Sequence, residues 1–110
     1  MSQHINFTSH NNELTSVLMG WDKPLQGFFM VIDKPDLGLD EPFWSNLNDH
    51  NPNYPKTLYS FLKILFKLKI TVPKQMIDEI LADGEQNMGN KEVFHSFYDG
   101  IYTRSEYRFN

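Results

Sequence analysis

The chain has 110 residues, a length at which one domain can bury a single hydrophobic core. Hydrophobic residues make up 40% and aromatic residues 15%, which excludes disorder for the segment 13–100. The absence of cysteine excludes disulfides, thiolate nucleophiles and cysteine-based zinc sites, and the formal net charge of -4 is laid out in alternating acidic and basic blocks.

The N-terminal segment, 1–12, is polar, and we expect it to be a frayed terminus. The start has no basic n-region and no apolar h-region, and nowhere do about 18 apolar residues run together. The sequence therefore predicts no export and no membrane span. We expect a single globular domain, 1–110, in the cytoplasm.

A β-hairpin is the first element that the pattern predicts. Residues 13–21 alternate in the manner of a half-buried strand, and residues 28–32 form a continuous apolar run of strand length. The break at 22–27 contains aspartate, proline and glycine, the residue types that form turns. The hairpin loop should have about five or six residues.

The next segment, 34–55, is rich in proline, asparagine and aspartate and predicts a long loop. Apolar residues at helical spacing then predict an amphipathic helix over 56–69 and a second over 73–83, with Gly84 as its C-terminal cap. Residues 91–98 alternate again and predict a third strand.

This order of elements predicts an α+β domain. We expect a small antiparallel sheet, made of the hairpin and the C-terminal strand, with two helices packed on one face. The last segment, 100–110, is expected to be a loosely ordered tail.

Motifs for chemistry are missing from the chain. The histidines show no HxH or HExxH spacing, the acids form no EF-hand, and the glycines form no phosphate loop. His95 and Ser96 are neighbours on a predicted strand, so their side chains point to opposite faces and cannot act as base and nucleophile. We predict no metal site, no cofactor and no catalytic residue.

Aromatic residues beside hydrogen-bonding groups are the candidate binding residues. Trp21 and Asp22 lie at the hairpin turn, and Phe43, Trp44 and Asn46 lie in the long loop. The competing interpretation, which we favour, is that both tryptophans plug the ends of the core.

Two further candidates have competing interpretations. His95 is a candidate polar group for ligand or partner binding, although a strand histidine among aromatic residues is more typical of a neutral, hydrogen-bonded core position. Lys56, Lys63 and Lys67 share one face of the predicted helix, which suits phosphate contacts or, in an acidic protein, a solvated charged surface.

Three stretches, GWDKPLQGFFMVI, EPFWSNL and DGEQNMGNKEVFHSF, resemble a family of short bacterial proteins. The shared features are a GWD-x-PL hairpin opening, a pair of phenylalanines in the next strand and a glycine-asparagine step before the last strand. The resemblance covers most of residues 19–98. It implies a bacterial origin and supports the strand after Gly89 and Asn90, but no activity is attached to the family.

Two functions stay open at this point. The favoured one is a non-enzymatic interaction protein that binds a protein partner or a second copy of itself through the aromatic loop, the charged helices or an open sheet edge. The alternative is a small-molecule binder or minor enzyme with a pocket between the 22–27 turn and the 34–55 loop. Nucleic-acid binding through the lysine helix is the least favoured.

Overall fold

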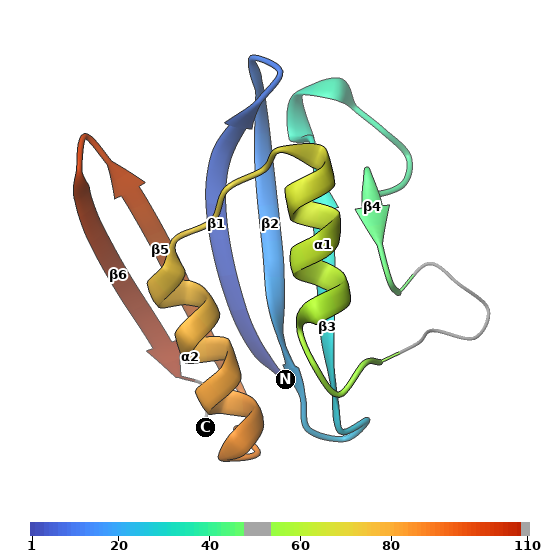
Figure 1. The fold of residues 1–110 in the computed structure, drawn as a ribbon, viewed down its shortest axis with the longest axis vertical. Coiled ribbons are helices and arrows are strands. Elements are labelled where there is room, and N and C mark those ends of the chain that lie inside the picture. Colours follow the sequence, from blue (N-terminus) through green and yellow to red (C-terminus); the bar gives the residue numbers. More distant parts are fainter. Residues whose placement is uncertain (48–53, 109–110) are drawn as a thin grey trace.

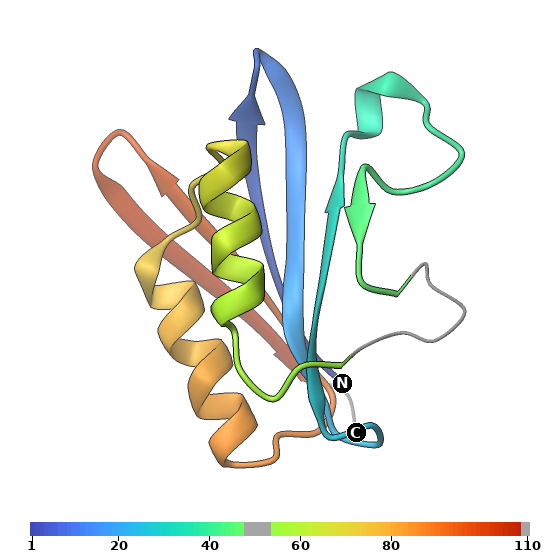
Figure 2. The same cartoon turned by 45° about the vertical axis from the view of Figure 1, so that its right-hand side comes forward.

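The computed structural model describes residues 1–47 and 54–108, which form an α+β fold (Figures 1 and 2). The strands are β1 (Ser2–His10), β2 (Glu13–Asp22), β3 (Gly27–Asp33), β4 (Trp44–Ser45), β5 (Lys91–Tyr98) and β6 (Ile101–Arg108). The helices are α1 (Tyr59–Leu68), α2 (Lys74–Glu85) and the short 3-10 helix η1 (Pro35–Leu37). Within the described ranges, no helix is long and apolar enough to cross a membrane.

All six strands belong to one sheet, in the order β4-β3-β2-β1-β5-β6. β1 pairs with β5 in parallel, and every other neighbouring pair is antiparallel. The prediction of a small, purely antiparallel sheet is therefore wrong, because the sheet is mixed and twice as wide. Parallel strands need a long connection, and the chain between β1 and β5 is long enough because it contains β2, β3, β4 and both helices.

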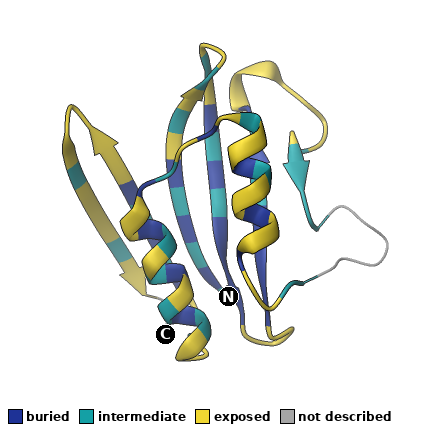
Figure 3. Ribbon diagram, in the orientation of Figure 1, coloured by how far each residue is buried: buried dark blue, intermediate teal, exposed yellow. Residues whose placement is uncertain are grey.

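The prediction of a frayed N-terminus is also wrong, because the segment Ser2–His10 forms β1 in the middle of the sheet. Its backbone pairs with β2 on one side and with β5 on the other, so its polar groups are satisfied away from water. The side chains on its inner face, Ser2, His4 and Asn6, are buried although they are polar. Figure 3 shows this alternation of buried and partly exposed residues along β1.

The expected loose tail is an edge strand. β6 pairs with β5 along its length, and residues 109–110 lie outside the described part of the chain. Asp99 and Gly100 join the two strands with φ values of 52° and 76°. An Asp-Gly pair with positive φ is the preferred two-residue hairpin turn, so this signal was present in the sequence.

The predicted hairpin, both helices and the third strand are confirmed as elements, but the hairpin loop is shorter than the predicted five or six residues, because β2 ends at Asp22 and β3 begins at Gly27. The assignment of Gly84 as a helix cap is wrong, since Gly84 lies inside α2. A Cβ at this position would come within 2.7 Å of the Phe28 ring, so the glycine permits a close approach of the helix backbone to β3. The predicted 34–55 loop contains η1 and β4, and residues 48–53 fall outside the described ranges.

An apolar cluster, called here the core cluster, joins residues from β2 and β3 to residues from both helices. Its members are Val17, Met19, Trp21, Phe28, Met30, Ile32, Leu58, Phe61, Leu65, Ile70, Met76 and Ile80. The members alternate along β2 and β3, so one face of these strands is the core face.

We predict that Gly20→Ala destabilises the protein by about 1–3 kcal/mol, the usual cost of overpacking. A Cβ at Gly20 would lie 1.8 Å from the Ser2 carbonyl oxygen, so the start of β1 would have to move. Urea unfolding measures the change. Gly89→Ala is the matched control, because a Cβ there meets nothing within 4 Å and its φ is not positive. Equal stability of the two variants would contradict the seating of β1 against β2.

Candidate functional site

A continuous series of short hydrogen bonds joins buried side chains of α2, β1, β5 and β6. His4 Nε2 lies 2.6 Å from Asp83 Oδ2, and His4 Nδ1 lies 2.8 Å from His95 Nε2. His95 Nδ1 in turn lies 2.7 Å from the hydroxyl of Tyr102. His4, Asp83 and His95 are each at most 2% exposed, so these contacts are shielded from water.

Charged side chains continue this series of hydrogen bonds on the other side of Asp83. Lys91 Nζ donates to Asp83 Oδ1 at 2.7 Å and to Glu79 Oε2 at 2.9 Å. Arg104 binds both oxygens of Glu79, at 2.7 and 2.6 Å, and also contacts Glu106. We call the group His4, Glu79, Asp83, Lys91, His95, Tyr102 and Arg104 the polar network.

The hydrogen-bond partners define the proton positions when both imidazole rings are neutral. The carboxylate of Asp83 only accepts, so the proton of His4 is on Nε2 and its Nδ1 accepts. His95 must then donate from Nε2, which leaves its Nδ1 to accept from the Tyr102 hydroxyl. Every donor in the line points towards Asp83.

The carboxylates of the network are held in the ionised form. Burial alone raises the pKa of Asp83, but hydrogen bonds from His4 and Lys91 outweigh it and the net shift is downward. Burial also raises the pKa of Glu79, and the hydrogen bonds from Arg104 and Lys91 lower it to about 2. The same pairings raise the pKa of Lys91 against the opposite effect of burial.

His95 is held neutral. Burial, followed by the charge that a protonated His4 would carry, lowers the pKa of His95 to about 4. This agrees with the core interpretation of His95 as a neutral, hydrogen-bonded residue. Three groups of the network, His4, Glu79 and His95, also bring one possible metal-ligating atom each to within 4.8 Å of one another.

The hairpin residues that the sequence proposed for binding have structural roles. Trp21 is 7% exposed, its ring lies edge-on to Phe28, and its indole N–H donates to Asn87 Oδ1 at 2.9 Å. Asp22 is 6% exposed and accepts from the backbone N–H of Leu25 in the turn. For Trp21 the structure therefore matches the interpretation of a core plug.

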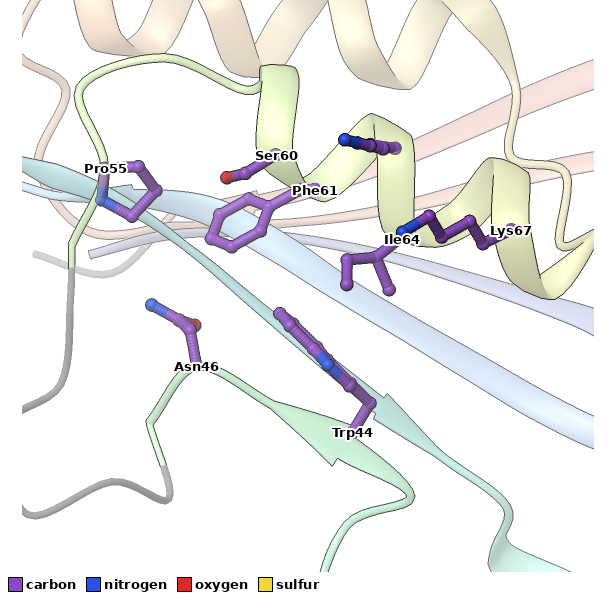
Figure 4. Close-up of a pocket in the computed structure, with 8 residues that line it drawn as sticks. Trp44, Asn46, Pro55, Ser60, Phe61, Ile64 and Lys67 are labelled. Carbon is purple, nitrogen blue, oxygen red and sulfur yellow. The ribbon is translucent and has the colours of Figure 1, made fainter.

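Four other sequence candidates come together around one cavity of about 360 Å³. Trp44, Asn46, Lys63 and Lys67 line it together with Pro55, Ser60, Phe61 and Ile64 (Figure 4). Trp44 lies edge-on to the ring of Phe61. No residue of the 22–27 turn lines this cavity, so it lies between β4 and α1 rather than between the turn and the loop.

The remaining candidates lie apart from it. Phe43 is 41% exposed, and the ammonium group of the buried Lys34 lies 4.8 Å from its ring centroid. Lys56 donates to the backbone carbonyl of Gln26 and thereby joins the hairpin turn to the start of α1.

Sequence reasoning missed most of the polar network, because its members come from four elements, of which β1 lies far from α2, β5 and β6 in the chain. One signal was available in α2. Glu79 and Asp83 lie three residues after Met76 and Ile80, so the two acids share a helix face with these buried apolar residues. Two acids on the buried side of an amphipathic helix require buried partners.

The chain was compared with protein-family models, with curated proteins and with solved structures, and no match was found. The resemblance to a family of short bacterial proteins stays a prediction.

We predict that His95 makes stability depend on pH between 6.5 and 4. The unfolded chain binds a proton at this histidine near pH 6.5 and the folded chain only near pH 4, so acidification favours unfolding. The free energy of unfolding should fall by about 3 kcal/mol over this window from His95 alone. Urea unfolding at several pH values measures the loss.

The variant His95→Gln should show a smaller loss over the same window. His10→Gln is the matched control, since His10 contacts Lys34 outside the polar network and its replacement should leave the His95 contribution in place. Parallel pH profiles for His95→Gln and the parent protein would contradict the prediction.

Proposed function

We propose that this protein is a non-enzymatic protein-binding domain of the bacterial cytoplasm, and that it binds its partner through one face of the sheet. The carrying observation is an apolar row across four strands on the face opposite the core cluster. We call this face the open face.

The proposal includes a two-layer arrangement in which both helices pack on the core face. Two observations support it. The core cluster contains residues of α1 and α2 together with alternate residues of β2 and β3, and both helices lie in front of the strands in Figure 1. Residues between the core positions then point to the other face, because successive side chains of a strand alternate.

The apolar row follows from the strand register. Val31 pairs with Leu18, Leu18 with Ile5, and Ile5 with Phe94. These four residues are partly exposed and come from β3, β2, β1 and β5. A sheet face that meets only water normally carries polar residues at such positions.

Large exposed side chains widen this row. Phe7 and Tyr107 are each 55% exposed, and Tyr98 is 81% exposed. Tyr107 lies edge-on to Phe94, with ring centroids 6.1 Å apart, so β6 continues the apolar surface. A contiguous apolar patch on a sheet face is a feature of protein-protein interfaces, in which aromatic residues are enriched.

The charges on the open face indicate the kind of partner. Its partly exposed charged strand residues, Asp33 and Glu92, are both acidic, as is the buried Asp22, and the whole chain has a net charge of -4. A partner with an apolar patch rimmed by lysine or arginine complements this surface. A second copy of the chain would bring acidic groups towards acidic groups, so we propose a different protein as the partner.

We predict that a photo-cross-linking phenylalanine analogue captures a protein when it replaces Phe7 but not when it replaces Phe66. Phe66 is the matched control because it is 84% exposed on α1, away from the sheet. The purified partner should bind the Phe7→Ser variant at least about tenfold more weakly than the parent protein, and the Phe66→Ser variant equally well.

Three outcomes contradict the proposal: the same products at both positions, no product at Phe7, or unchanged binding by Phe7→Ser. Light scattering at several salt concentrations measures the oligomeric state and thereby tests whether the open face binds a second copy of the chain instead of a different protein. A dimer that dissociates on Phe7→Ser would mean that the open face binds a second copy.

A second candidate function, small-molecule binding, is supported by the cavity between β4 and α1. Trp44 and Phe61 give it aromatic walls, while Lys63 and Lys67 give it positive charge. This chemistry suits a flat, anionic molecule such as an aromatic carboxylate.

We predict that an aromatic carboxylate that binds here changes the fluorescence of Trp44. The signal should persist in Trp21→Phe, because Trp21 is buried elsewhere, and vanish in Trp44→Phe. Lys63→Gln should weaken binding about threefold to tenfold, the effect of one partly screened charge. If a panel of such compounds leaves the fluorescence and the melting temperature of the parent protein unchanged, this second candidate is wrong.

A further inference from the structure

The polar network contains a position between two imidazole rings that has the features of a metal site. His4 Nδ1 and His95 Nε2 face each other at 2.8 Å. One ligand atom each from His4, His95 and Glu79 also lie within 4.8 Å of one another. The three residues come from β1, β5 and α2, so the fold rather than the local sequence brings them together.

The outer nitrogens of both rings already have the partners that metal-bound histidines use. His4 Nε2 lies 2.6 Å from the Asp83 carboxylate, and His95 Nδ1 lies 2.7 Å from the Tyr102 hydroxyl. A metal-ligating histidine typically donates its second N–H to a carboxylate or another oxygen, which fixes the ring and its tautomer. Asp83 is itself oriented by Lys91.

A metal ion can replace the proton that lies between the two rings without the loss of a proton from the network. With both rings neutral, one proton lies between them on His95 Nε2. When a metal ion takes that place, the proton moves to His95 Nδ1 and is donated to the Tyr102 oxygen, so no proton is released. Tyr102 is a partly exposed residue, so its hydroxyl would then donate to water instead of to His95.

The donor set selects the class of metal. Two imidazoles and one carboxylate suit zinc and its neighbours cobalt, nickel and copper, whereas magnesium and calcium prefer oxygen ligands. Tetrahedral zinc with bonds of about 2.0–2.1 Å separates two nitrogens by about 3.3 Å. The rings must therefore part by about half an ångström from the observed 2.8 Å, which small side-chain rotations supply.

An ion from solvent would reach the site on the side of Glu79. The side chains of Glu79 and Arg104 are 20% and 35% exposed, while His4 is fully buried. Glu79 would exchange one of its contacts with Arg104 for the ion, and Arg104 keeps its contact with Glu106. The Glu79–Arg104 ion pair is therefore the more exposed side of the polar network, and Glu79 keeps its contact with Lys91.

We propose that His4, His95 and Glu79 bind one transition-metal ion of the zinc class, with Asp83 and Tyr102 as the groups that orient the two rings. This differs from the expectation of no metal site, which rested on the spacing of histidines along the chain. Ligands from separate strands leave no such spacing.

The test is a titration of the full chain with Zn²⁺ at neutral pH, followed by calorimetry and by the ring nitrogen resonances of its histidines. One ion should bind per chain, and the resonances of His4 and His95 should shift while those of His10 stay in place. Co²⁺ should give visible absorption bands of a four- or five-coordinate site, and Mg²⁺ should not compete.

Variants distinguish a metal site from a structural network. His95→Gln should weaken Zn²⁺ binding at least a hundredfold, and Tyr102→Phe, which removes only the outer partner, about tenfold. His10→Gln is the matched control and should bind like the parent protein. Circular dichroism checks that each variant is folded.

The spectra of the unaltered protein decide the matter if His95→Gln does not fold. The proposal is wrong if Zn²⁺ leaves the ring resonances of His4 and His95 unchanged. It is equally wrong if a folded His95→Gln variant binds Zn²⁺ as tightly as the parent, or if Mg²⁺ displaces Zn²⁺.

Discussion

The carboxylate of Asp83 connects α2 to β1 and β5 through hydrogen bonds. It lies on α2, is 2% exposed, and accepts hydrogen bonds from His4 on β1 and from Lys91 on β5. A buried carboxylate is tolerated only when such donors replace its water, and removal of one partner of a buried charged pair commonly costs about 3–5 kcal/mol. The position of α2 relative to β1 and β5 therefore depends on these directional contacts, and so does the burial of the polar side of β1.

The interior consists of two chemically different halves. Under β2 and β3 it is the apolar core cluster, whose packing depends on shape and volume. Under β1, β5 and β6 it is the polar network, in which every buried side-chain nitrogen and oxygen of the described residues has a partner. Apolar packing tolerates small shifts, whereas a continuous series of hydrogen bonds does not, so the polar half fixes α2 relative to β1 and β5.

This division also explains which parts of the fold the sequence predicts. The hairpin, the helices and β5 carry apolar residues at strand or helix spacing, and hydrophobic periodicity identifies them. β1 was missed because its buried side consists of polar residues, Ser2, His4 and Asn6. His4 and Asn6 find partners 79 and 89 residues away, and Ser2 accepts from the backbone of Trp21 in the neighbouring strand. Trp44, Lys63 and Lys67 were recognised as candidates, but their convergence on one cavity depends on the placement of β4 beside β3. That pairing has only two residues in β4, too few to predict from a pattern.

The parallel pairing of β1 with β5 links the two proposals geometrically and keeps them separate energetically. His4 and His95 point to the core face, while their sequence neighbours Ile5 and Phe94 pair on the open face. The two strands are held at a fixed spacing by their backbone ladder, which is flanked by β2 and β6. Parting of the imidazole rings is therefore accommodated by side-chain rotation rather than by separation of the strands. The apolar row across the open face would keep its spacing with an ion between the rings, so we expect the two proposed binding events to be independent of each other.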